Sequence, residues 1–199
     1  MTKEELLASL KKKGCPDYIL NAFEKVRRED FIPDRLIGYA YEDIALPVEE
    51  GSTLSQPSTI AFMLNLLEPK DGQKILEIGS GSGYVLALLA EINKTGKIYG
   101  VEILKSMAIS SKKRLESKTN VEILHRSGAN GLKEFAPFDR ILISASCPSI
   151  PYHLIEQLAN QSILVAAVRQ SIVQLKKENG QITEKEFPGF AFVPLIDKE

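Results

Sequence analysis

The sequence predicts a doubly wound, Rossmann-like α/β fold with a mostly parallel sheet, an antiparallel C-terminal edge and an N-terminal helical extension. From residue 74 onward, short β-rich runs alternate with helical runs, as in consecutive βαβ units. Gly79, Gly81 and Gly83 join the first of these strands to its helix, the place where open α/β sheets bind ligands. Before residue 70, the only periodicity is helical.

Two helices are expected at the N-terminal end of the chain. Thr2 and Glu5 have the spacing of a capping box, and apolar residues follow them at helical intervals. A second amphipathic helix is expected over residues 18–26, ending at the charged run of residues 27–30.

Residues 39–57 have neither a helical nor a strand period and are rich in glycine, proline and serine. Irregular segments carry function more often than helices do, so this segment is the first functional candidate. Ser55 is expected to be the N-cap of the following helix, with Pro57 in its first turn and an apolar stripe over residues 60–67.

The remainder of the chain supplies the sheet. Parallel strands are expected over residues 74–79, 97–102, 121–124, 140–144 and 162–168, with helices over residues 84–92, 104–118 and near 152–158. Asn179-Gly180 then predicts a hairpin turn between two antiparallel strands, because both residues tolerate positive φ. Residues 190–195 are a last strand candidate.

Length and composition favour one domain over residues 1–199, with a helical and loop segment (1–70) preceding a Rossmann-like core (71–199). The 25 Lys and Arg against 26 Asp and Glu leave no positive excess for a nucleic-acid partner. Apolar runs are too short for a membrane span, and the acidic first residues are unlike a signal peptide. We therefore expect a cytoplasmic monomer without membrane partners.

The two cysteines do not suggest a metal site. Cys15 and Cys147 are far apart in sequence, and only His125 and His153 could join them as soft ligands. We expect both cysteines to be reduced, buried and small apolar side chains, and we do not expect Cys147 to be catalytic.

The glycine-rich run does not fit a dinucleotide site. A G-x-G-x-x-G fingerprint would place its third glycine at the position of Tyr84, whereas this chain has Gly83 one residue earlier. NAD is therefore disfavoured as a cofactor.

The run Glu77-x-Gly79-x-Gly81-x-Gly83 instead resembles motif I of class I methyltransferases, which binds S-adenosylmethionine. Glu77 fills the acidic position of the motif, and Glu102, at the end of the second strand, can accept hydrogen bonds from both ribose hydroxyls. The competing interpretation is a tight glycine turn beside two exposed glutamates.

Further motifs narrow the resemblance to the protein-L-isoaspartate O-methyltransferase family and cover almost the whole chain. The block from Thr53 to Pro57, T-x-S-Q-P, is the most diagnostic, because generic class I methyltransferases do not have it. The other matching segments are residues 27–33, 39–43, 46–47, 136–139 and 192–195.

The resemblance implies the site residues. Ser55 would be the active-site serine. The competing interpretation is that Ser55 is only the helix N-cap, and a third is that it serves both roles. The cofactor S-adenosyl-L-methionine, with S-adenosyl-L-homocysteine as product, would contact Thr53, Leu54, Glu77, Gly79, Ser80, Gly81, Gly83, Glu102, Ile103, Ser127 and Gly128.

The chain departs from the family pattern at several loops. Ser127 stands where relatives usually have an aspartate near the adenine. Asn160-Gln161-Ser162 replaces a glycine pair, and Ala167-Val168-Arg169 replaces P-V-G, which predicts loops of different shape. Ile196 replaces a threonine of some relatives, and Ser146-Cys147 replaces small alanines in the loop facing the substrate.

The sequence thus predicts an enzyme that methylates isoaspartyl carboxylates in damaged proteins for repair. Two alternatives stay open: a methyltransferase of the same fold acting on another carboxylate, and a cofactor-binding adaptor without isoaspartyl activity.

Overall fold

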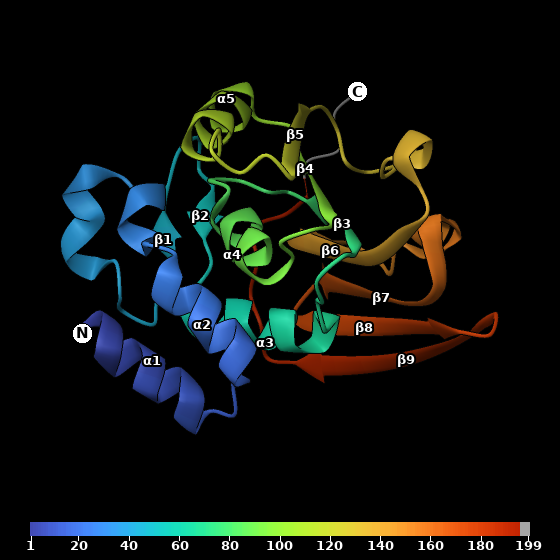
Figure 1. Cartoon of the computed structure of the whole chain (residues 1–199), viewed down its shortest axis with the longest axis horizontal. Coiled ribbons are helices and arrows are strands. Elements are labelled where there is room, and N and C mark those ends of the chain that lie inside the picture. The colour runs from blue at the N-terminus through green and yellow to red at the C-terminus, as the bar shows by residue number, and fades with distance from the viewer. Residues whose placement is uncertain (196–199) are drawn as a thin grey trace.

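The computed structural model describes residues 1–195. Its main sheet has the order β5-β4-β3-β6-β7-β8-β9, in which the first five strands in this order run parallel and β8 and β9 are antiparallel additions. The strands are β3 (Lys74–Ile78), β4 (Lys97–Glu102), β5 (Val121–His125), β6 (Phe138–Cys147), β7 (Leu158–Val168), β8 (Ser171–Glu178) and β9 (Gln181–Pro188). The predicted fold class is confirmed (Figure 1).

The strand order sets the position of the site. The chain enters the sheet at β3, moves outward to β4 and β5, and then returns to add β6 on the other side of β3. In open α/β sheets such a reversal leaves a crevice outside the carboxyl ends of the central strands. The loops that follow β3, β4 and β6 therefore meet at one edge of the sheet.

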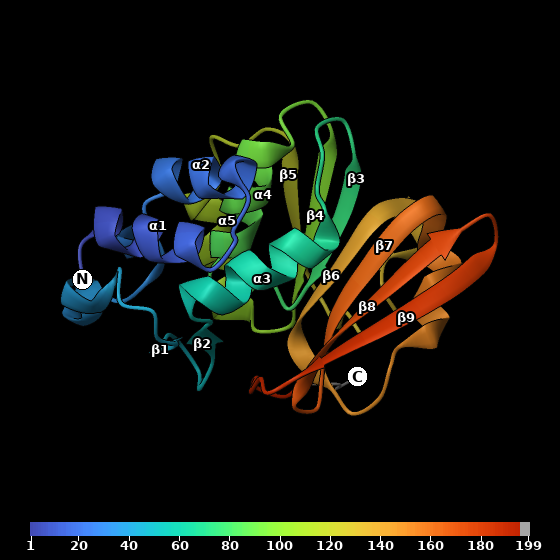
Figure 2. The same ribbon diagram turned by 90° about the horizontal axis from the view of Figure 1, so that it is seen from below.

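One face of the sheet is covered by α-helices, and Figure 2 shows α1 to α4 gathered on this side. A single cluster of buried apolar side chains joins these helices to the sheet, from Leu6 to Ile172. The helices are α1 (Lys3–Lys12), α2 (Asp17–Lys25), α3 (Pro57–Leu67), α4 (Tyr84–Ile92) and α5 (Lys105–Arg114).

The opposite face has its own apolar cluster and is covered by short 3-10 helices. Leu132 beside η3 (Lys133–Phe135) and Leu154 in η4 (Tyr152–Gln157) pack onto side chains of β3 and β6. The helix expected near residues 152–158 is thus a six-residue 3-10 helix that ends where β7 begins. Such short connecting segments are commonly 3-10 helices.

Before the main sheet, the chain forms an irregular cap. It contains η1 (Arg28–Phe31), η2 (Asp34–Tyr39) and a small antiparallel pair, β1 (Leu46–Pro47) with β2 (Thr53–Leu54). The capping box at the start of α1 is confirmed, because the Thr2 hydroxyl accepts from the Glu5 amide and the Glu5 carboxylate accepts from the Thr2 amide.

The hairpin prediction is also confirmed. Asn179 and Gly180 have φ values of 51° and 79°, two consecutive left-handed residues as a two-residue turn between twisted strands requires. Among residues 1–195, no helix is long and apolar enough to cross a membrane.

Several local expectations are wrong. Ser55 is not the N-cap of α3: Gln56 takes the extended cap conformation and Pro57 is the first helical residue, with no side-chain cap bond. Residues 190–195 form no strand, only one bridge between Ser146 and Pro194. Ile196 lies outside the described residues.

The cysteines differ from each other. Both are free thiols, and Cys147 is buried as expected, whereas Cys15 is only half-buried. Burial raises the pKa of the Cys15 thiol to about 11, so this sulfur stays protonated at neutral pH.

Candidate active site

Two adjoining cavities lie at the carboxyl ends of β3, β4 and β6. We call them the Glu77 cavity and the Glu102 cavity, after the acidic residue in each wall. They share the residues Thr53, Gly79, Gly81 and Ser144, so the two form one continuous cleft. The Glu77 cavity extends toward α3 and α4, and the Glu102 cavity extends along the end of β4 toward Gly128.

The glycine loop forms the floor between the two cavities. Gly79 has φ 76°, and a Cβ there would lie 3.2 Å from the Cβ of Ala145, so a side chain at this position would crowd the last residues of β6. Gly83 has a different role. It is the left-handed N-cap of α4. A Cβ there would press on Ser111 of α5 and on Leu115, the C-cap of that helix. Gly83 lines neither cavity.

Glu77 is the most desolvated acid of the site. Its side chain is 1% exposed, Oε1 accepts a 2.7 Å hydrogen bond from the Ser144 hydroxyl, and Oε2 has no partner within the described chain. Burial, together with the negative charge of Glu102, raises the pKa of Glu77 to about 8, although the hydrogen bond from Ser144 acts against both. The carboxyl is therefore held largely neutral at pH 7 in the ligand-free protein.

Glu102 is also buried, at 6% exposure, but each oxygen of its carboxylate accepts a hydrogen bond from a backbone amide. Oε2 accepts from the Gly81 amide at 2.7 Å and Oε1 accepts from the Leu104 amide at 2.9 Å. Each oxygen retains a second lone pair that can face the cavity. The competing interpretation of two exposed glutamates beside a glycine turn is thereby excluded.

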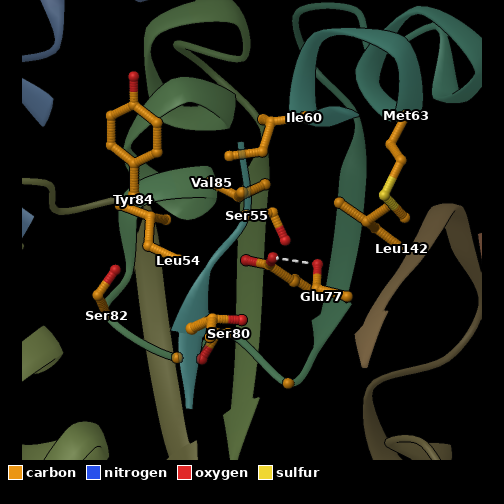
Figure 3. A pocket seen from close by; sticks show the side chains of 14 residues that line it. Leu54, Ser55, Ile60, Met63, Glu77, Ser80, Ser82, Tyr84, Val85 and Leu142 are labelled. Carbon is orange, nitrogen blue, oxygen red and sulfur yellow. Dashed lines mark hydrogen bonds between the residues drawn. The ribbon is translucent and has the colours of Figure 1, made fainter. Parts of the chain in front are cut away.

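Ser55 and the two residues before it line the Glu77 cavity from the side opposite the sheet. Figure 3 shows the Ser55 hydroxyl directed toward the Glu77 carboxyl, with Leu54 and Ile60 beside it. Apolar side chains of α3 and of the central strands, Ile60, Met63 and Leu142 among them, complete the wall. A hydroxyl and a carboxyl thus meet in a mostly apolar pocket.

The far end of the Glu102 cavity matches the expectation only in part. Gly128 and Ile103 line it, and a Cβ on Gly128 would lie 2.5 Å from Cγ2 of Ile78. Ser127 instead turns toward its own backbone, where its hydroxyl accepts from the Ala129 amide at 3.3 Å. Ser80 lines the Glu77 cavity with a buried hydroxyl that makes no hydrogen bond within residues 1–195.

Comparison with known proteins decides the family. The family model described as protein-L-isoaspartate(D-aspartate) O-methyltransferase (PCMT) matches residues 1–199. The chain belongs to this family. A protein-L-isoaspartate O-methyltransferase from Methanococcoides burtonii is 40% identical over 200 residues, covering 97% of this chain and 98% of the relative.

Two solved structures share the fold of the methyltransferase family. One, described as a putative protein-L-isoaspartate O-methyltransferase from Plasmodium falciparum in complex with S-adenosyl-L-homocysteine, superposes with a TM-score of 0.85 at 26% identity, covering 98% of this chain and 99% of that one. Another protein-L-isoaspartate O-methyltransferase gives a TM-score of 0.88 at 28% identity, with 97% of this chain and 65% of that longer chain covered.

Two residues in the segments that depart from the family pattern have left-handed backbone conformations. Gln161 and Arg169 stand within the segments where the family has glycines, and they have φ values of 57° and 53°. This is the left-handed region that favours glycine, so these two side chains occupy a strained conformation. Arg169 is held there by bonds from its backbone amide to the Cys147 carbonyl and from its side chain to the Pro148 carbonyl.

Sequence reasoning did not single out three contributors to the cleft. Ser144 ends the strand expected over residues 140–144 and lies within β6, and its hydroxyl is the one partner of the Glu77 carboxyl in the described chain. Val193, Pro194 and Leu195 line the Glu102 cavity because two backbone bonds tie them to Ser146. Arg28 lies behind Ser55 and donates to its carbonyl.

Proposed function

We propose that the chain is an S-adenosylmethionine-dependent methyltransferase that esterifies the carboxylate of isoaspartyl residues in damaged proteins, the first step of their repair. The observation that carries the proposal is the Glu77 cavity, where the Ser55 hydroxyl and a buried carboxyl meet beside a second acid-lined cavity, in a chain of this family. The ester formed can cyclise to a succinimide.

The residues of the cleft fit the cofactor. The glycine loop offers close backbone approach, Glu102 offers one unused lone pair on each oxygen for a pair of ribose hydroxyls, and Gly128 leaves room for a flat group. Glu77 presents an unpartnered oxygen at the opposite end, in the described chain. S-adenosylmethionine supplies the transferable methyl group and a positive charge. The proposed cofactor contacts are therefore the glycine loop, Glu77, Glu102 and Gly128, together with Thr53, Leu54, Ser80, Ile103 and Ser127.

The chemistry asks for orientation and dryness more than for a strong base. An isoaspartyl carboxylate is already ionised at neutral pH. Methyl transfer cancels its charge against that of the donor, so a poorly hydrated pocket favours the transition state over the separated ions. The apolar side chains of Leu54, Ile60 and Met63 exclude water from the Glu77 cavity, and the Ser55 hydroxyl can donate to one carboxylate oxygen.

Transfer of radiolabelled methyl to an isoaspartyl peptide, with its normal aspartyl twin as control, tests the proposal. Labelling of the isoaspartyl peptide alone supports it. Equal labelling of both, or of other carboxylates only, points to a methyltransferase with a different substrate. Labelling of neither, with intact binding of S-adenosylhomocysteine by calorimetry, points to an adaptor.

We further propose that residues 1–199 act as one domain, because a single apolar cluster joins the N-terminal helices to the sheet. Damaged proteins and peptides bearing isoaspartate would be its partners. The cytoplasmic location and the monomeric state stay predictions from the sequence.

A further inference from the structure

The charged run after α2 contains two arginines with opposite environments. Arg27 is a surface residue whose side chain is 65% exposed and pairs with Glu29 and Asp30. Arg28, the next residue, is 0% exposed. A run of charges predicts a solvated helix end, so the burial of one member of this run requires a reason.

The guanidinium of Arg28 is bound by backbone carbonyls. Nη1 donates to the carbonyls of Ala40 at 2.8 Å and Glu42 at 3.1 Å, and Nη2 donates to the carbonyls of Ile44 and Ser55, both at 3.1 Å. The nearby carboxylates are engaged elsewhere, since Asp43 pairs with Lys13 and Glu29 with Arg27. Within residues 1–195, Nε is unpartnered.

These four carbonyls come from two segments that the sequence separates. Residues 40–44 precede β1, whereas Ser55 lies just before α3. Arg28 therefore joins the start of the irregular cap to the residue that enters the active-site cavity. Asp43 makes a second tie between the same segments, because its Oδ1 accepts from the Ser58 amide in the first turn of α3 at 2.8 Å.

The bond to Ser55 bears directly on the direction of its side chain. A carbonyl held by a fork of fixed geometry restrains the peptide plane that begins at the Ser55 Cα, and so restrains the place of this Cα, from which the hydroxyl points toward the Glu77 cavity (Figure 3). No side-chain bond of Ser55 itself supplies this in the described chain, and Ser55 has no capping role on α3.

We propose that Arg28 is a positioning residue for the methyl-transfer reaction, which holds Ser55 in place by gathering the carbonyls of residues 40, 42, 44 and 55. This inference rests on the proposed function, because it acts through Ser55. On this proposal the buried guanidinium of Arg28, and not a capping interaction with α3, sets the position of Ser55.

The test is a double-mutant cycle on the full chain with an isoaspartyl peptide. Arg28→Lys keeps the charge but lacks the fork, so kcat at saturating peptide should fall by about five- to ten-fold, no more than on loss of the Ser55 hydroxyl itself, while Kd for S-adenosylhomocysteine stays within about two-fold. Because the loss acts through Ser55, Arg28→Lys should add less than about two-fold to the effect of Ser55→Ala. Arg27→Lys is the matched surface control.

Two outcomes overturn the inference. One is a double variant whose loss is the product of the single losses, which would make Arg28 independent of Ser55. The other is a Kd for S-adenosylhomocysteine that weakens as much as kcat falls, which would make Arg28 a general support of the fold. If Arg28→Lys does not fold, Arg28→Met, which removes the buried charge with the donors, is tested in the same cycle.

Hydrogen exchange separates this inference from the proposed function. If the wild-type chain labels no isoaspartyl peptide, the proposed function fails, yet the positioning still predicts faster amide exchange in residues 40–56 of Arg28→Lys than of Arg27→Lys, with the central strands unchanged. Equal exchange of residues 40–56 in the two variants overturns the positioning itself.

Discussion

The two acids of the cleft lie on neighbouring strands and have opposite electrostatic settings. Glu77 on β3 receives one hydroxyl bond and has one unpartnered oxygen in the described chain. Glu102 on β4 receives a backbone amide on each oxygen. Two backbone amides thus replace lost water at the oxygens of Glu102, whereas burial with a single hydroxyl partner raises the pKa of Glu77.

The difference between the two acids suits the two ends of the proposed ligand. Ribose hydroxyls are neutral donors and need a fixed acceptor, which Glu102 is. A positively charged group needs a partner that can ionise when the group arrives, which Glu77 is. The two ends are also coupled, since the charge of Glu102 helps to keep Glu77 neutral.

The largest expected effect is on the pH dependence of stability. The pKa of Glu77 is raised from 4.5 to about 8 by folding, so its contribution is fully present below pH 4.5 and is lost as pH rises to 8. We expect this to lower the free energy of unfolding of the ligand-free protein by on the order of 3 kcal/mol between pH 5 and pH 8. Glu77→Gln, which is neutral throughout, should not show this fall.

Urea unfolding of the wild type and Glu77→Gln at several pH values measures the effect. The two stability curves should converge near pH 5 and separate by pH 8, with the variant the more stable. Parallel curves would mean that folding does not raise the pKa of Glu77.

The next effect concerns the Glu102 end. Glu102→Ala should weaken binding of S-adenosylhomocysteine by about 1.5–3 kcal/mol, the contribution of hydrogen bonds to a charged group. Glu102→Gln should recover little, because its amide nitrogen would face the amide of Gly81 or Leu104, donor against donor.

Calorimetry on both variants checks the Glu102 prediction. Glu122→Ala is a control, since Glu122 lies on β5 and forms only an exposed pair with Lys97. Unchanged affinity in Glu102→Ala would remove the ribose assignment.

The central sheet and the glycine loop could be predicted from the sequence because their signals are local. Alternating runs, a glycine series and Asn179-Gly180 each report a backbone geometry that few other residues allow. The position of Glu102 follows from the same pattern, since it ends the second strand of the series. These features need no knowledge of distant partners.

The presentation of Ser55 could not be predicted in this way. The sequence Ser55-Gln56-Pro57 allows the N-cap of α3 to be either Ser55 or Gln56. In the structure Gln56 has the extended conformation of the N-cap. The burial of Arg28 could not be predicted either, because its four acceptors come from residues 40 to 55, far along an irregular segment. Tertiary hydrogen bonds to backbone carbonyls leave no side-chain signature in the sequence.

A smaller effect is expected for Ser55→Ala at the Glu77 end. Loss of one hydrogen bond to the substrate carboxylate should lower kcat for an isoaspartyl peptide about ten-fold, or about 1.5 kcal/mol. Stability should change by less than about 0.5 kcal/mol, because no helix cap is lost. Ser58→Ala in the first turn of α3 is the control. Full kcat in Ser55→Ala would remove its catalytic assignment.

The smallest effect is expected at Ser127, which precedes the cavity-lining Gly128. Ser127→Asp should tighten binding of S-adenosylhomocysteine several-fold, because a charged acceptor contributes about 1 kcal/mol more than a neutral one toward an exocyclic amine. The introduced carboxylate could also keep the bond from the Ala129 amide that Ser127 now accepts. Peptide preference should not change. Calorimetry that finds weaker binding would mean that the new carboxylate is repelled by the charge of Glu102 and finds no hydrogen-bond donor. In that case, of Ser127 and Gly128, only Gly128 contributes to the adenine end of the cleft.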